Sequence, residues 1–92
     1  MIVRWMKPAA DDLNHISDYT DEHFGTDRAR ETALVIWEAA DSLSVTPYRG
    51  RPGRKRNTRE IVLPGLPFLI IYRLRAQAVE ILRILHGAQK WP

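Results

Sequence analysis

The sequence predicts an α+β fold in which a strand and a helical hairpin precede a three-stranded antiparallel meander, in the order β-α-α-β-β-β. Between residues 8 and 44, apolar residues recur every three or four positions in two segments, which is typical of helices. Between residues 59 and 86, short runs rich in β-branched and aromatic residues are separated by turns. Because the helices come first and the strands last, we expect the helices to pack on one face of one sheet.

Each of the first elements has its own signature. Residues 2–6 alternate weakly and are predicted to form a strand that Pro8 stops. The first helix is predicted to begin at Pro8 and to end before Gly25, which can adopt the left-handed conformation that closes a helix. The second helix is predicted from about Asp27 to about Ser44. Residues 45–53 contain two prolines and two glycines among arginines and are predicted to be a loop.

Strands are predicted over residues 59–63, 68–74 and 79–86. The pair Pro64-Gly65 supplies the turn between the first two of these strands. A tight turn at Ala76-Gln77 joins the last two and sets Arg73 opposite Glu80 as a cross-strand ion pair. We expect both of the last two strands to be central in the sheet, with residues 2–6 joining the same sheet.

Apolar residues occupy both faces of the last two predicted strands, so neither strand can leave one face in water. In so small a chain the helices can cover only one face, which predicts that a partner covers the other. Strict alternation of side chains gives the membership of the faces. It groups Leu69, Ile71 and Arg73 on one face of residues 68–74, and Val79, Ile81, Arg83 and Leu85 on one face of residues 79–86.

Length and composition bound the class of protein. Ninety-two residues are enough for one modest core, so a single domain over residues 1–92 is expected. The chain has no cysteine, which excludes disulfides and thiolate chemistry and fits a reducing compartment. No apolar run approaches the length of a membrane span, and the start lacks a signal-peptide pattern. We therefore expect a cytoplasmic protein with no membrane partner.

The charge of the chain is divided unevenly. Residues 1–42 carry nine acids and four bases, for −5, and residues 43–92 carry ten bases and two acids, for +8, which together give the net charge of +3. Such asymmetry suggests that the C-terminal half meets something anionic, either nucleic acid or an acidic protein segment. The segment 49–59 holds six bases and no acid. It is either a solvated loop or a contact surface for phosphates.

The histidines and tryptophans leave several roles open. His86, at the end of the last strand, is either a general acid or base or a hydrogen-bonded strand end. His15 and His23 are eight residues apart, which is no zinc motif, so no metal is expected. Trp91 either anchors a target or folds back over the sheet. The other tryptophans, Trp5 and Trp37, are expected to pack in the core or between the helices.

The C-terminal third resembles a known family. The motifs TREIVLPG over residues 58–65, IIYRL over residues 70–74 and VEILRILHG over residues 79–87 follow the predicted helical hairpin. Together they resemble the RelE/ParE superfamily of toxins from bacterial type II toxin–antitoxin modules. The resemblance covers nearly the whole chain and implies an antitoxin whose C-terminal segment wraps the toxin in a hetero-oligomer. The antitoxin-binding residues that it implies on the second sheet face are Leu69, Ile71, Arg73, Arg83 and Leu85.

The superfamily divides by target, and the resemblance favours one branch. RelE-like members cut messenger RNA on the ribosome with a catalytic arginine at the position that corresponds to Leu69 here. Another basic residue of those ribonucleases corresponds to the region of Ala88 and Gln89, and their C-terminal tyrosine has no counterpart. ParE-like members lack this set and poison DNA gyrase. The resemblance therefore implies a ParE-like, non-enzymatic gyrase inhibitor with a ParD-like acidic antitoxin and no cofactor.

Two alternatives stay open. One is a RelE-like ribosome-dependent endoribonuclease, in which His86 is the catalytic candidate, and the other is a basic nucleic-acid-binding module without toxicity. In each reading the basic segment and the tail supply contacts to the target. The residues proposed for those contacts are Arg51, Arg54, Lys55, Arg56, Arg59, Lys90 and Trp91.

Overall fold

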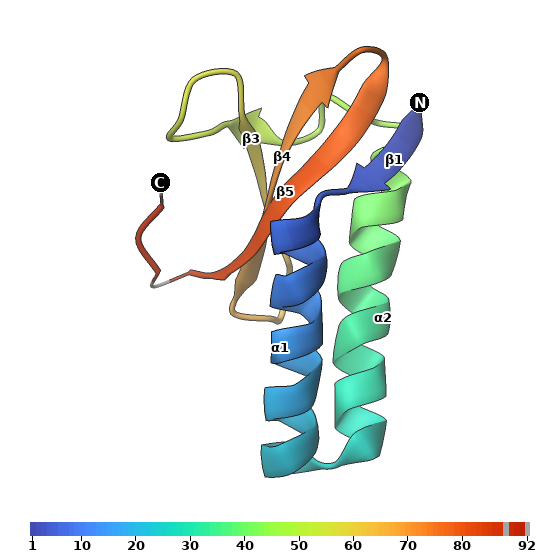
Figure 1. The fold of residues 1–92 in the computed structure, drawn as a ribbon, viewed down its shortest axis with the longest axis vertical. Coiled ribbons are helices and arrows are strands. Elements are labelled where there is room, and N and C mark those ends of the chain that lie inside the picture. The colour runs from blue at the N-terminus through green and yellow to red at the C-terminus, as the bar shows by residue number, and fades with distance from the viewer. Residues whose placement is uncertain (88, 92) are drawn as a thin grey trace.

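The computed structural model describes residues 1–87 and 89–91. Its elements are β1 (Ile2–Trp5), α1 (Lys7–Phe24), α2 (Thr26–Ser42), β2 (Arg51–Pro52), β3 (Arg59–Val62), β4 (Phe68–Arg75) and β5 (Ala78–His86). The strands form one sheet in the order β1-β5-β4-β3-β2, in which β1 runs parallel to β5 and all other neighbours are antiparallel. Figure 1 shows the two helices lying side by side as a hairpin against the sheet.

The predicted α+β fold is confirmed, with one addition. The two residues of β2 lie inside the segment expected to be a loop, and they extend the sheet by a short edge strand beside β3. Pro52 is tolerated there because an edge strand has one side without ladder hydrogen bonds. Neither helix in the described residues combines the length and the apolar character that a bilayer crossing requires.

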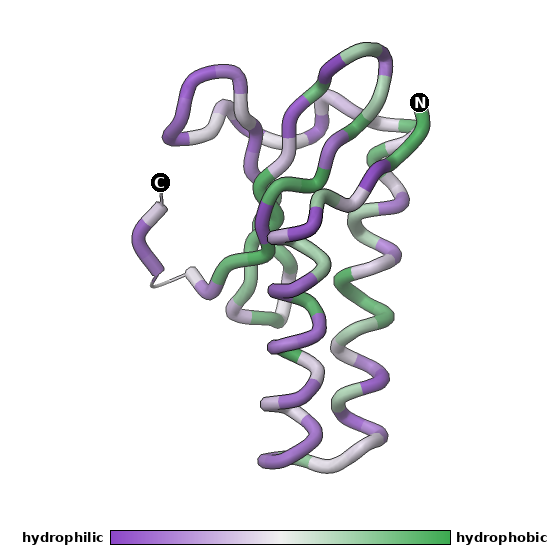
Figure 2. The backbone as a smooth tube through the Cα atoms, viewed as in Figure 1, coloured by the Kyte–Doolittle hydropathy of each residue, from purple (hydrophilic) through white to green (hydrophobic). Residues whose placement is uncertain are grey.

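The main core lies between the helices and one face of the sheet. The fully buried Ala9 of α1 and Ile36 and Ala40 of α2 belong to the same cluster as Ile70 and Ile81 of the central strands. Small alanines at the helix positions let the helix backbones approach the sheet closely. Figure 2 shows hydrophobic colour on β4 and β5 where they pass the helices, whereas the loop between β2 and β3 is hydrophilic.

Strand β5 contains an irregularity that the sequence did not reveal. Its pairing with β4 shifts between residues 71 and 72 of β4, so that Leu82 has no opposite partner and forms a bulge. Ile81 before the bulge and Ile84 after it both face the helices, while Arg83 and Leu85 turn to the second face. The expected strict alternation is therefore wrong beyond Ile81.

The hairpin between β4 and β5 has the predicted register. Ala76 and Gln77 form its two-residue turn, and both have positive φ, 52° and 59°, as the right-handed twist of the flanking strands requires. Arg73 lies opposite Glu80 as predicted.

The two tryptophans expected in the core behave differently. Trp5 is half-buried and packs against the main core. Trp37 of α2 is 48% exposed, so its expected burial is wrong. Its neighbour Ile36 is fully buried, and a helix places adjacent residues about 100° apart, so Trp37 is turned away from the sheet.

Candidate partner-binding face and basic loop

A second apolar cluster lies on the sheet face opposite the helices. Leu69, Ile71 and Leu85 form this second-face cluster and are 4%, 0% and 2% exposed. Leu69 and Leu85 are direct cross-strand neighbours, and Ile71 lies two residues along β4 from Leu69. Alternation along residues 68–74 predicted that Leu69 and Ile71 share a face, and the bulge at Leu82 brings Leu85 beside them.

The chain itself covers this cluster, which corrects the expectation that only a partner could do so. Leu82, projected by the bulge, and Trp91 of the C-terminal segment pack against it. The segment turns back after β5 because the backbone N–H of Gln89 donates to the carbonyl of His86 at 2.9 Å, and the Gln89 side-chain oxygen accepts from the His86 N–H at 2.6 Å. Of the two roles left open for Trp91, the structure has its side chain packed against the second-face cluster.

The C-terminal tail, described at residues 87 and 89–91, also contacts residues 49–59, which we call the basic loop. The Lys55 ammonium lies 5.9 Å from the centre of the Trp91 ring, within the range of a cation–π interaction. Trp91 is only half-buried, so one part of its ring stays accessible. Within the described residues, the second-face cluster is therefore covered by Leu82 and the half-buried Trp91 rather than by a helix.

Arg73 is held on the second face by Glu80. Its Nε donates to Glu80 Oε1 at 2.6 Å, and about one third of the Arg73 side chain remains exposed. This hydrogen bond from Arg73 is the main reason why the pKa of Glu80 lies below its usual value of 4.5, with Arg75 and Arg4 adding to the effect. The pKa of the Glu80 carboxyl is lower in the folded protein than its usual value of 4.5. The ionised pair therefore stabilises the fold fully at pH values above that usual value, and this stabilisation is lost as the pH falls through the lowered pKa.

Arg83 is paired within the chain, and with a partner that the sequence did not indicate. Its guanidinium makes a bidentate contact with Asp12 of α1, at 2.7 Å from Nε and 3.0 Å from the terminal nitrogen. The same carboxylate accepts the backbone N–H of Ile84 at 2.9 Å. Strand β1 pairs with β5 only as far as Ile81, so Asp12 takes the place of a missing strand neighbour beyond that point.

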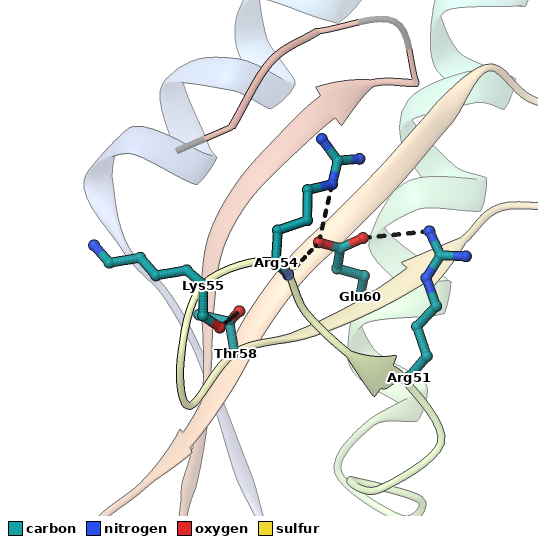
Figure 3. Close-up of polar contacts among 5 residues, drawn as sticks. All are labelled: Arg51, Arg54, Lys55, Thr58 and Glu60. Carbon is teal, nitrogen blue, oxygen red and sulfur yellow. Dashed lines mark hydrogen bonds and ion pairs between the residues drawn. The ribbon is translucent and has the colours of Figure 1, made fainter.

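Two of the loop arginines are held by one buried carboxylate (Figure 3). The Glu60 side chain is 1% exposed and lies 3.3 Å from Arg51 and 3.5 Å from Arg54. It also accepts the backbone N–H of Arg54 at 3.1 Å. A buried carboxylate is tolerated only when it is paired and hydrogen-bonded, and here the two arginines meet that requirement. Arg51 and Arg54 therefore anchor the loop to the second face as well as carrying charge.

Arg59 and Tyr72 fix the other end of the loop. Arg59 donates to the carbonyl of Gly50 at 2.7 Å and lies 5.0 Å from the centre of the Tyr48 ring. The fully buried Tyr72 hydroxyl accepts the Gly50 N–H and donates to the carbonyl of Pro47, both at 2.8 Å. A Cβ at Gly50 would lie 2.6 Å from the Tyr72 hydroxyl, so only glycine fits this close approach.

The exposed cations that remain are candidates for contact with a target. Arg56, at the tip of the loop, and Lys90, in the tail, are exposed and make no ion pair within the described residues. Lys55 is exposed beside Trp91. Among the residues proposed for target contact, these three leave the most charge available to a phosphate or a carboxylate.

His86 lies in a different environment from these cations. Its ring meets Phe68 edge to face, with centroids 6.0 Å apart, and lines an open cavity of about 540 Å³ between α1 and the end of the sheet. His15, Tyr19, Phe24 and Arg28 line the same cavity, and none of residues 49–59 does. The structure thus separates His86 from the basic loop. No cluster of three or more potential metal ligands occurs within the described residues.

The chemistry available at residue 69 is limited by its side chain. Leu69 is buried in the second-face cluster, and an aliphatic group can neither transfer a proton nor neutralise a phosphate. Ala88, part of the second region compared with the superfamily ribonucleases, lies outside the described residues. Gln89 uses its side-chain oxygen to hold the tail turn.

The chain begins with a strand and a helical hairpin, has this strand order, and folds a basic loop over the second sheet face. With these features it belongs to the RelE/ParE superfamily of toxins from type II toxin–antitoxin systems. Residues 3–91 match the family model described as the ParE toxin of the type II toxin–antitoxin system parDE. The chain therefore belongs to the ParE toxin family.

Two known proteins are similar in sequence to this chain over nearly its full length. Protein Y4kP of Sinorhizobium fredii is 39% identical over 90 residues, covering 98% of this chain and 92% of that protein. Toxin RelE2 of Caulobacter vibrioides is 37% identical over 87 residues, covering 95% of this chain and 96% of that protein.

Solved structures share the fold. A chain of the chromosomal ParDE toxin–antitoxin system from P. aeruginosa superposes with a TM-score of 0.86 at 28% identity, covering 94% of this chain and 95% of that chain. A chain of the RelBE2 toxin–antitoxin complex from Mycobacterium tuberculosis gives a TM-score of 0.66 at 24% identity, covering 92% and 95%, and shows the fold alone.

Proposed function

We propose that this ParE toxin inhibits bacterial DNA gyrase without catalysing a reaction of its own. The observation that carries the proposal is the buried, aliphatic Leu69, at the position where the resemblance to RelE-like ribonucleases calls for a catalytic arginine. The match of residues 3–91 to the ParE family supports the same branch. A gyrase inhibitor acts in the cytoplasm, where the bacterial chromosome lies.

The second candidate is a ribosome-dependent endoribonuclease. It is favoured by the 37% identity to a protein named Toxin RelE2, and by exposed cations at Lys55, Arg56 and Lys90 that suit a phosphate backbone. In this case the loop and tail would have to supply both the charge stabilisation and the proton transfers. His86 is an unsuitable contributor because it faces the cavity beside α1.

Expression of the toxin without an antitoxin separates the candidates. We expect growth to stop within a few generations, with induction of the DNA-damage response and with messenger RNA 5′ ends unchanged. The reason is that a trapped gyrase breaks DNA, whereas a ribonuclease cuts transcripts. A double reversal, Arg56→Glu with Lys90→Glu, should relieve the toxicity, and Lys7→Glu, an exposed cation on α1, should not.

Cuts at fixed codon positions without a DNA-damage response would replace the gyrase proposal by the ribonuclease. Normal growth with the folded protein at high level would favour a nucleic-acid-binding module without toxicity. Mapping of transcript ends and a DNA-damage reporter, read from the same cultures, distinguish these results.

We further propose that an acidic, ParD-like antitoxin segment docks on the second sheet face. The face offers a cluster of Leu69, Ile71 and Leu85 beside Arg73, which suits an amphipathic segment that folds on binding. In the free toxin Trp91 packs against this cluster, so the antitoxin segment would displace the tail and replace its apolar contacts.

The arginines around the second face differ in how free they are to bind an acidic segment. Arg83 is engaged by Asp12, so it belongs to the rim of the surface rather than to the free charges. Arg51 and Arg54, held by Glu60, border the same face and add positive charge for an acidic partner.

A further inference from the structure

The outward surface of α2 carries an unpartnered stripe. Arg30, Leu34, Trp37 and Asp41 are all exposed, and Leu34 and Trp37 are 53% and 48% exposed. Successive members are four, three and four residues apart, the spacing that keeps side chains on one line of a helix. The residues that α2 buries, such as Ile36, lie on the other side of the helix. We call these four residues the α2 stripe.

The α2 stripe has opposite charges at its two ends and apolar groups between them. Within the described residues, neither Arg30 nor Asp41 takes part in an ion pair or a side-chain hydrogen bond. Leu34 and Trp37 are neighbours one turn apart, and no other element of the described chain covers them. An exposed apolar pair with charged ends is the pattern of a contact surface more than of a solvated face.

We propose that the α2 stripe is a homodimer interface, in which two copies of this chain pair through antiparallel α2 helices. A two-fold axis between residues 34 and 37 sets Leu34 of each copy against Trp37 of the other. The same axis sets Arg30 of each copy against Asp41 of the other. The stripe is thus complementary to itself, as an isologous interface requires.

The charges specify the direction of pairing. A parallel arrangement would bring the two Arg30 side chains together and the two Asp41 side chains together, which is unfavourable. Either direction would bury both tryptophans, but only the antiparallel arrangement forms two ion pairs. This agreement between charge and apolar positions favours a second copy over an unrelated partner, since one helix supplies both halves of every contact.

The interface is small, so the dimer is expected to be weak. Stable protein interfaces bury about 1,200–2,000 Å², and one pair of helices of this length supplies less than that. Glu31 and Glu38 lie on the same side of the stripe, and the two-fold axis would bring Glu31 of each copy toward Glu38 of the other, which further limits affinity. We expect a dissociation constant of about 10–100 μM.

A charge-swap experiment tests the dimer. The full-length toxin, refolded after removal of any bound antitoxin, is measured by sedimentation equilibrium over a range of concentrations. Arg30→Asp and Asp41→Arg should each weaken self-association at least tenfold, because each places like charges at both ends of the interface. An equimolar mixture of the two variants should associate about as well as the native protein, since both ion pairs re-form between unlike copies.

Arg28→Asp changes the same charge on the same helix but off the α2 stripe, and should leave the association unchanged. Far-ultraviolet circular dichroism confirms that each variant is folded. A native protein that stays monomeric up to about 1 mM would overturn the proposal. So would single variants that associate like the native protein, or a mixture that associates no better than either variant alone.

Discussion

Replacing Asp12 with alanine is expected to lower the free energy of unfolding by about 2–3 kcal/mol. The carboxylate is 18% exposed and accepts three hydrogen bonds, two from Arg83 and one from the backbone of Ile84. Its loss leaves a charge without its partner on β5 and an open strand edge where β1 no longer pairs. Chemical denaturation followed by circular dichroism measures the change.

The preceding residue supplies the matched control. Asp11 is also on α1 and also pairs with a cation, Lys7, but both side chains are largely exposed. Such pairs contribute about 0.3–0.5 kcal/mol, so Asp11→Ala should have a correspondingly small effect. Equal losses for Asp11→Ala and Asp12→Ala would show that Asp12 does not anchor α1 to the sheet.

Replacing Trp91 with alanine is expected to raise the affinity for the antitoxin about tenfold. In the native toxin the incoming segment must first displace Trp91 from the second-face cluster, and a displacement cost of about 1.4 kcal/mol corresponds to a factor of ten. Isothermal titration calorimetry measures the difference, with the antitoxin sought first as the product of the adjoining open reading frame.

Phe24→Ala is the control for this measurement, because it removes an aromatic side chain that is 68% exposed, outside both the second face and the α2 stripe, and should leave the affinity unchanged. An affinity of Trp91→Ala that is unchanged or weaker would reject displacement of the tail. A charge at Ile71 is no substitute for this test, since Ile71 is fully buried and Ile71→Asp would unfold the protein before it reported on binding.

Most of the fold follows from local patterns in the sequence. The helices, the Ala76-Gln77 turn and the Arg73–Glu80 pairing were all predicted, because each depends on residues that are close in the chain. The bulge at Leu82 was not, since an apolar residue in an apolar strand carries no mark of an irregular register. That one residue moved Ile84 to the helix side of the sheet.

The candidate site was predictable in part. The pattern placed Leu69 and Ile71 together on the second face, but coverage by Trp91 depends on how the tail turns, which no periodicity reveals. The contact between Asp12 and Arg83 joins residues 71 positions apart, so only the folded chain brings it to light. Glu60 could have been found as the anchor of the loop, because it is the first acid after six bases.

The most direct test of the account uses purified gyrase, supercoiled plasmid and the refolded toxin. We predict that the toxin inhibits supercoiling and increases the amount of linear plasmid recovered after denaturation of the enzyme, as expected when gyrase is trapped on cut DNA. Active toxin that leaves supercoiling and DNA cleavage unchanged, while it cuts messenger RNA on ribosomes, would contradict the account.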